Sequence, residues 1–156
     1  MRTTAEYYDD LDEPQLKGQA TEAHLKAAFV KRGFSLLEPA YDNEQYDFVI
    51  ERQGLFYRVQ AKTARLLDTG TIQFETVSTK SRSDGYVRDD YAGAIDYFAV
   101  YSPDVDRSYL VYIEDAARGK MEIRVEPPKN NQMAGINWHE DYALDAVLAE
   151  GLRQYD

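Results

Sequence analysis

The sequence has no cysteine, only two histidines and no long apolar run. The lack of cysteine excludes a disulfide framework and a cysteine-type zinc site. The two histidines, His24 and His139, are too few to suggest a histidine-rich metal site. No apolar segment approaches the roughly 18 residues that a membrane-spanning helix needs, and the first residues lack the pattern of a signal peptide. We therefore expect a soluble cytoplasmic protein with no membrane partner.

Basic side chains are also scarce, because 18 Lys and Arg stand against 28 Asp and Glu, for a net charge of −10. This balance argues against general nucleic-acid binding, in which contacts to phosphate supply much of the affinity. Residues 58–88 are an exception, with six basic and three acidic side chains. The basic ones are Arg58, Lys62, Arg65, Lys80, Arg82 and Arg88. Two interpretations stay open: a local DNA-binding surface on an acidic body, or a chance fluctuation.

The chain length of 156 residues fits a single domain over residues 1–156. Apolar residues make up 44% and aromatic residues 13%, which excludes a disordered chain. The acidic and polar residues 1–13 are expected to fray. A strongly acidic surface is also typical of proteins from a salt-loaded cytoplasm, so a halophilic source is a hypothesis. Full activity and normal refolding in low-salt buffer would count against it.

Residues 46–62 predict two strands around a tight turn. Val, Ile, Phe and Tyr dominate both arms, and Gly54 supplies the backbone freedom that a chain reversal needs. If Gln53 and Gly54 form the loop, Arg52 faces Leu55 across the hairpin. This register then fixes every other pair between the two strands.

In that register Asp47 lies opposite Gln60, and Lys62 points to the same face because side chains alternate along a strand. One interpretation is a site for a hard cation, because Mg²⁺ binds oxygen ligands and leaves room for water and phosphate. A lysine beside such a cation could hold the attacking water and stabilise phosphate charge. The alternative is a solvated sheet edge with an ordinary Asp–Lys pair, which contributes little.

A helix is predicted over residues 14–32, since it begins at a proline and stops before a glycine. Leu25 and Phe29 form its buried stripe, and Glu22 falls on or beside that stripe. A carboxylate in this position is costly unless it is paired or metal-bound. Pairing with Lys26 one turn later is the plain alternative to a role in a metal site.

The rest of the chain alternates strands with polar connections and closes with a helix. Strands are predicted at residues 34–37, 71–77, 95–101, 108–113 and 121–125, a polar loop at 78–90, and a final helix capped by Asn137. Asp96 either supports the predicted site or simply begins its strand. The order of a helix, a hairpin, further strands and a closing helix predicts a mixed α/β sandwich.

Asp47, a turn and then Gln60-Ala61-Lys62 resemble the PD-(D/E)XK nuclease signature, in which an Asp is followed by a (D/E)xK tripeptide on the next strand. Gln60 stands where an acidic residue is usual, as in the group I intron-encoded homing endonucleases that use QxK. Residues 16–22 resemble the first helix of archaeal Holliday-junction resolvases, whose glutamate belongs to the same metal cluster. The resemblance spans residues 17–112.

The resemblance implies a restriction-endonuclease-like mixed sheet flanked by helices, with the N-terminal helix followed by a catalytic β-hairpin. It implies a metal-dependent DNA endonuclease of the homing or resolvase-like kind, using Mg²⁺ or Mn²⁺ as a substitute. Asp47, Gln60 and the main-chain carbonyl of Ala61 would be metal ligands, and Glu22 would complete the cluster directly or through water. Lys62 would position the attacking water.

DNA is the implied partner, with Arg58, Arg65, Lys80, Arg82 and Arg88 as the candidate contacts. A chain this short has little room for a separate recognition domain, so we expect a homodimer or a higher homo-oligomer if a duplex is cut twice. The rival hypothesis is a catalytically inactive nuclease fold that binds nucleic acid or a protein. It arises because the neutral amide of a glutamine holds Mg²⁺ less strongly than a carboxylate.

Overall fold

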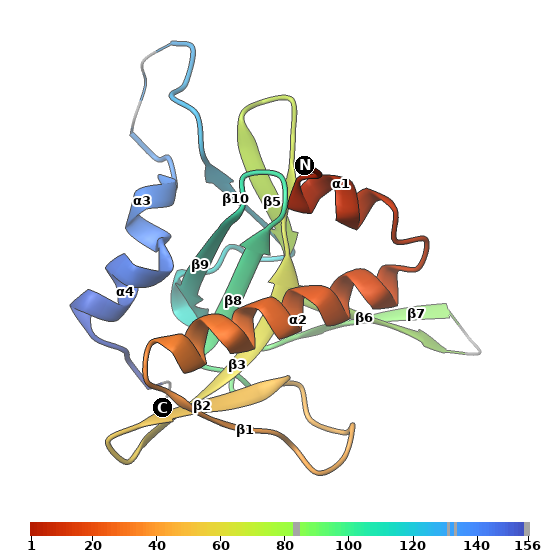
Figure 1. Cartoon of the computed structure of the whole chain (residues 1–156), viewed down its shortest axis with the longest axis vertical. Helices are drawn as coiled ribbons and strands as arrows, with labels where there is room; N and C mark the ends of the chain where they lie inside the picture. The colour runs from red at the N-terminus through yellow and green to blue at the C-terminus, as the bar shows by residue number, and fades with distance from the viewer. Residues whose placement is uncertain (83–84, 131, 133, 155–156) are drawn as a thin grey trace.

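The computed structural model describes residues 1–82, 85–130, 132 and 134–154. Its centre is a five-stranded mixed sheet in the order β1-β2-β3-β8-β9 (Figure 1). These strands are β1 Ser35–Leu37, β2 Phe48–Arg52, β3 Leu55–Thr63, β8 Tyr97–Ser102 and β9 Arg107–Tyr112. Only β3 and β8 pair in parallel within this sheet, and the other neighbours are antiparallel. The predicted mixed α/β architecture is confirmed.

The long helix α2 (Pro14–Lys31) crosses one face of this sheet. Leu25 and Phe29 of this helix are completely buried in a core shared with Phe48 and Val59 of the hairpin. The helix begins at a proline, and Gly33 directly after its C-cap has a φ of 89°, which suits glycine. The sequence therefore predicted both ends of this helix.

The opposite face is covered by a small sheet in the order β10-β5-β4. Its strands are β4 Arg65–Leu66, β5 Thr71–Glu75 and β10 Lys120–Arg124. Side chains of β8 alternate between the two cores, with Tyr97 and Ala99 toward α2 and Phe98 and Val100 toward the small sheet. Burial on both faces explains why this strand is an almost unbroken apolar run.

The hairpin of β2 and β3 has the register that its sequence predicts, with Arg52 opposite Leu55. Gln53 and Gly54 both have positive φ, 56° and 79°. Two positive φ values in a two-residue loop match the twist of antiparallel strands. The turn therefore fixes which residues of the two strands lie opposite each other at the far end of the hairpin.

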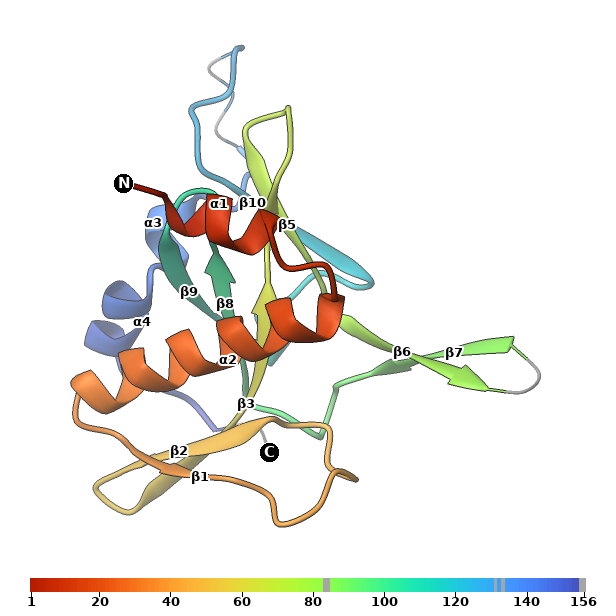
Figure 2. The ribbon, with the colours of Figure 1, turned by 45° about the vertical axis from the view of Figure 1, so that its right-hand side comes forward.

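Three expectations were wrong. Residues 1–13 do not fray, because α1 (Thr4–Asp9) has a capping box at its start and buries Tyr8 against α2. Residues 78–82 and 85–90 are not a loop, and residues 83–84 of that prediction lie outside the described residues. The two described segments contribute to β6 (Val77–Arg82) and β7 (Gly85–Asp90), a two-stranded ribbon that projects from the body (Figure 2). The sequences of these two strands, VSTKSR and GYVRDD, lack the regular apolar–polar alternation that identifies a strand.

The third wrong expectation concerns the C-terminal helix, which is interrupted at Ala143. It forms α3 (His139–Tyr142) and α4 (Leu144–Glu150), after the short 3-10 helix η1 (Ile113–Asp115) and β10. Asn137 does not cap it, because its side chain bonds the carbonyl of Glu122 and the hydroxyl of Tyr142. Within the described part of the chain, no helix combines the length and apolarity needed to span a membrane.

Candidate active site

Asp47 lies directly before β2, where the hairpin ends. Its N–H donates to the carbonyl of Val59 at 2.8 Å, and its carboxylate accepts from the N–H of Ala61 at 2.8 Å. The pairing of Phe48 with Val59, extended by one residue, sets Asp47 against Gln60. Burial raises the pKa of Asp47 to about 6, against the opposing effect of the Ala61 hydrogen bond.

Glu22 reaches this point because α2 is fixed onto the end of β3. The hydroxyl of buried Thr21 contacts that of Thr63 at 2.7 Å and that of Tyr8 at 2.9 Å. This row of hydroxyls ties α1, α2 and β3 together, one residue before Glu22. The carboxylate of Glu22 lies close enough to raise the pKa of Asp47 further. The two carboxylates thus share one charged environment.

Lys26 joins this cluster from the next turn of α2. Its ammonium lies 2.8 Å from the Glu22 carboxylate and 2.5 Å from that of Glu38. Burial opposes its charge, but the two carboxylates outweigh burial, so the pKa of Lys26 is raised. These three residues and Asp47 are among those that line a cavity of about 270 Å³, to which the loop before β2 contributes two more carboxylates, Asp42 and Glu44. Glu22 therefore both pairs with Lys26 and faces the cavity beside Asp47.

Lys62, near the end of β3, is the second lysine whose charge reaches Asp47. Its ammonium donates to the hydroxyl of Tyr91 at 3.1 Å and lies 4.8 Å from the centre of that ring. Burial lowers the pKa of Lys62, while the charges of Asp47 and Glu75 raise it. Burial also raises the pKa of Tyr91, so the tyrosine remains a neutral phenol.

Sequence reasoning missed Tyr91 and Glu75. Tyr91 follows the β6–β7 ribbon, and Glu75 ends β5 just before it. Neither residue lies near Lys62 along the chain, and no local pattern marks them. The fold alone brings them to Lys62.

Gln60 lies two residues before Lys62 on β3, is partly buried, and pairs in register with Phe98 of β8. Among the described residues, no three acidic or histidine side chains gather into a metal cluster. Magnesium sites, however, commonly use one or two carboxylates with water and substrate phosphate. Asp47, Glu22, the Gln60 amide oxygen and the Ala61 carbonyl offer a compatible donor set, and the mutual repulsion of the two carboxylates favours a cation between them.

The candidate DNA contacts have different environments. Arg58 is held by buried Asp96, whose carboxylate accepts from the Arg58 main-chain N–H at 2.7 Å and from its guanidinium at 3.2 Å. Asp96 therefore links β3 to β8 instead of merely beginning a strand. Arg65 is exposed on β4. The remaining candidates, Lys80, Arg82 and Arg88, fall on the ribbon, and their side chains lie outside the described part of the structure.

Residues 12–145 match the family of PD-(D/E)XK endonucleases, and the chain belongs to this family. It is similar to Protein 5.3 of Escherichia phage T7, with 31% identity over 116 residues that cover 74% of this chain and 92% of that protein. The fold is similar to that of the bacterial homing endonuclease I-Ssp6803I, with a TM-score of 0.72 and 20% identity over 88% of this chain and 93% of that one. The predicted superfamily and the restriction-endonuclease-like fold are thereby confirmed.

Proposed function

We propose that this protein is a divalent-metal-dependent endonuclease that hydrolyses phosphodiester bonds of DNA at the site around Asp47. The observation that carries the proposal is that Asp47 and Lys62, both partly buried, lie close enough for their charges to interact, at the end of the β2–β3 hairpin of a chain from a nuclease family. Burial opposes both charges, and such perturbed groups in clefts are typical of functional sites.

Asp47, the amide oxygen of Gln60 and the carbonyl of Ala61 would hold Mg²⁺, with Mn²⁺ as a substitute, and Glu22 would complete the set directly or through water. When bound, the cation would supply positive charge to the phosphate and make water more acidic. The Ala61 N–H fixes one oxygen of Asp47, which leaves the other oxygen available as a ligand. Gln60 cannot act as a general base, so its part is limited to binding.

Lys62 would orient the attacking water and offset the charge that develops on the phosphate. Its hydrogen bond to Tyr91 restricts the ammonium of a long, flexible side chain to one position. Burial increases the strength of its interaction with phosphate, because the surroundings are less polar than water. Lys62 is thus prepared for this role before the substrate binds.

The kind of DNA substrate is part of the proposal. Homing-endonuclease-like cutting of a duplex and resolvase-like cutting of a branched DNA are both compatible with this site. Cutting both strands would require two copies of the chain, so we propose a homodimer or higher homo-oligomer. We also propose a cytoplasmic location, and a halophilic source as the explanation for the net charge of −10.

The second candidate function, an inactive nuclease fold that binds nucleic acid or a protein, is favoured by one observation. Lys26 already neutralises Glu22, and Gln60 adds no charge for a cation. This candidate predicts DNA binding that is indifferent to Mg²⁺ and to Lys62.

The test is cleavage of supercoiled plasmid, a four-way junction and single-stranded DNA in Mg²⁺, in Mn²⁺ and in EDTA, over a range of KCl. The proposal predicts cutting of at least one substrate in either metal and none in EDTA. Salt is varied because it weakens phosphate contacts, whereas a halophilic protein would need it. Absence of cutting by the folded protein under all conditions would favour the binding module.

A further inference from the structure

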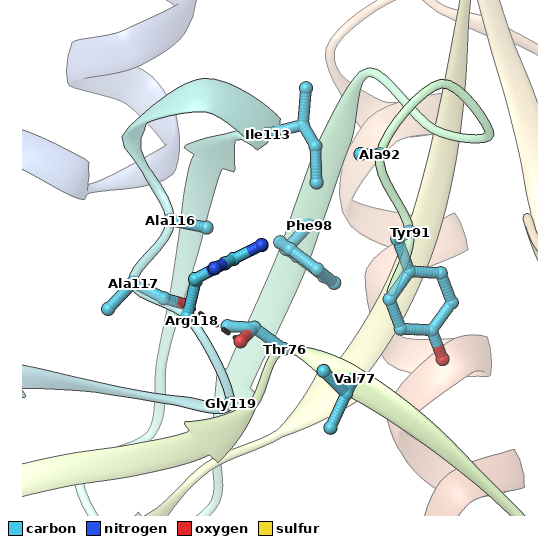
Figure 3. A pocket seen from close by; sticks show the side chains of 10 residues that line it. All are labelled: Thr76, Val77, Tyr91, Ala92, Phe98, Ile113, Ala116, Ala117, Arg118 and Gly119. Atoms are coloured by element: carbon cyan, nitrogen blue, oxygen red, sulfur yellow. Dashed lines mark hydrogen bonds between the residues drawn. The ribbon is translucent and has the colours of Figure 1, made fainter. Parts of the chain in front are cut away.

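A second cavity shares Tyr91 with the candidate active site. The hydroxyl of Tyr91 accepts from Lys62, while its ring helps to line a cavity of about 330 Å³. The other walls come from the β5–β6 junction, from β8 and from the segment around η1 (Figure 3). One tyrosine side chain therefore joins Lys62 to the wall of this cavity.

The cavity is formed before any ligand binds, because hydrogen bonds join its walls. Thr76 donates its N–H to the carbonyl of Gly119 at 2.9 Å and its hydroxyl to the carbonyl of Ala117 at 2.6 Å. Tyr91 and Phe98 pack edge to face with ring centres 5.4 Å apart. Pre-formed cavities of a few hundred Å³ commonly bind small ligands. Its volume lies at the lower end of that range and suits a single ring system better than a longer ligand.

Arg118 determines the chemistry of this cavity. The other described residues that line it are uncharged, and Figure 3 shows the guanidinium of Arg118 reaching over it. None of the described residues accepts a hydrogen bond from this guanidinium or forms an ion pair with it. A planar donor above apolar walls, including Ile113 and Val77, fits a flat ring with acceptors on one edge.

We propose that this cavity binds one unpaired base of the DNA strand that is cut, with guanine preferred. Guanine offers two adjacent acceptors, O6 and N7, to an arginine fork, whereas other bases match it less well. A base enters such a cavity only after leaving its stack, which costs least where it is already unpaired. The inference rests on the proposed function, and it narrows the substrate to DNA with an extrahelical nucleotide beside the scissile phosphate.

The test measures binding without catalysis, by fluorescence anisotropy in EDTA. Three labelled duplexes are compared: fully paired, with one bulged guanine, and with one bulged thymine. We expect the wild type to bind the guanine bulge about 10-fold more tightly than the paired duplex, the size of one stacked and hydrogen-bonded base. The affinity for the thymine bulge should lie between these two affinities.

Two variants should weaken base binding in the cavity by different means. Arg118→Gln removes the charged fork, and Ala116→Leu fills the space from a side chain that points inward (Figure 3). Both should reduce the preference for the guanine bulge to less than about 2-fold. Arg107→Gln is the matched control, because Arg107 is also exposed but lies outside this cavity. It should weaken binding to all three duplexes by the same factor.

A wild type without preference for the bulge, or a preference that survives in both cavity variants, would overturn the inference. A check of folding by circular dichroism accompanies each variant. The two proposals fail separately. If the protein prefers the guanine bulge but cuts no DNA in Mg²⁺, base binding in the cavity is supported and the nuclease function is refuted. If it cuts DNA without a preference for the bulge, the nuclease function is supported and base binding is refuted.

Discussion

Replacement of Asp47 by Asn should stabilise the protein in the absence of metal. The ionised carboxylate is partly buried and lies in the negative field of Glu22. Asn keeps an oxygen that can accept the N–H of Ala61, and it removes the charge. The substitution therefore relieves an unfavourable interaction at little structural cost, as expected where a functional site is kept at the expense of stability.

The pKa gives the size of this effect. In the folded protein the pKa of Asp47 is about 6, whereas an exposed aspartate has a pKa of about 3.9. Because one pKa unit corresponds to about 1.4 kcal/mol, the ionised carboxylate lowers the free energy of unfolding by roughly 3 kcal/mol above pH 6. Between about pH 4 and pH 6 the folded state binds more protons than the unfolded state, so this loss of stability grows as pH rises.

Urea denaturation in EDTA at about pH 4 and about pH 8 measures this difference. At the higher pH, Asp47→Asn should exceed the wild type by about 2–3 kcal/mol, and at the lower pH the two should agree. Asp145→Asn is the control, and it should change the free energy of unfolding in the opposite direction. Arg32 holds the pKa of exposed Asp145 below its ordinary value, so removal of this charge should destabilise the protein at the higher pH. If Asp47→Asn is no more stable than the wild type at the higher pH, the reasoning is refuted.

Three further predictions concern the site and its support. Gln60→Glu should lower the Mg²⁺ concentration that gives half-maximal cleavage, and an unchanged Mg²⁺ dependence would exclude Gln60 as a ligand. Tyr91→Phe should reduce kcat about 10-fold with little change in KM, because it removes one hydrogen bond that positions Lys62; an equal change in KM would argue instead for a role in binding. Thr21→Val should lower the free energy of unfolding by about 1–2 kcal/mol, measured in urea, because it removes the buried hydroxyl that joins two others. An unchanged urea midpoint for that variant would show that the row of hydroxyls does not hold α2 in place.

The elements fixed by local rules could be predicted from the sequence. The two-residue turn at Gln53 and Gly54 sets the whole hairpin register, and with it the position of Asp47 opposite Gln60. Proline at the start of α2 and glycine after it fixed that helix. These features depend on backbone conformation over a few residues, which the side chains nearby determine.

The elements fixed by distant contacts could not be predicted. α1 is held by the contact of Tyr8 with Thr21, and the sequences of β6 and β7 have no regular apolar–polar alternation that would mark them as strands. The same holds within the site. Asp47 and Lys62 follow from strand alternation, whereas Tyr91 reaches Lys62 only because the chain returns after the ribbon. Polar side chains that meet across the fold leave no period in the sequence.

The central claim is that Lys62, which bonds Tyr91 and lies in the field of Asp47, promotes hydrolysis of DNA. The most direct test is the single-turnover cleavage rate in Mg²⁺ of the wild type, of Lys62→Ala and of Lys31→Ala, an exposed lysine on α2 outside the site. The account predicts that cutting by Lys62→Ala falls by at least about 100-fold, the scale of one lost charge-stabilising group. It predicts an unchanged rate for Lys31→Ala. Equal rates for all three proteins would contradict it.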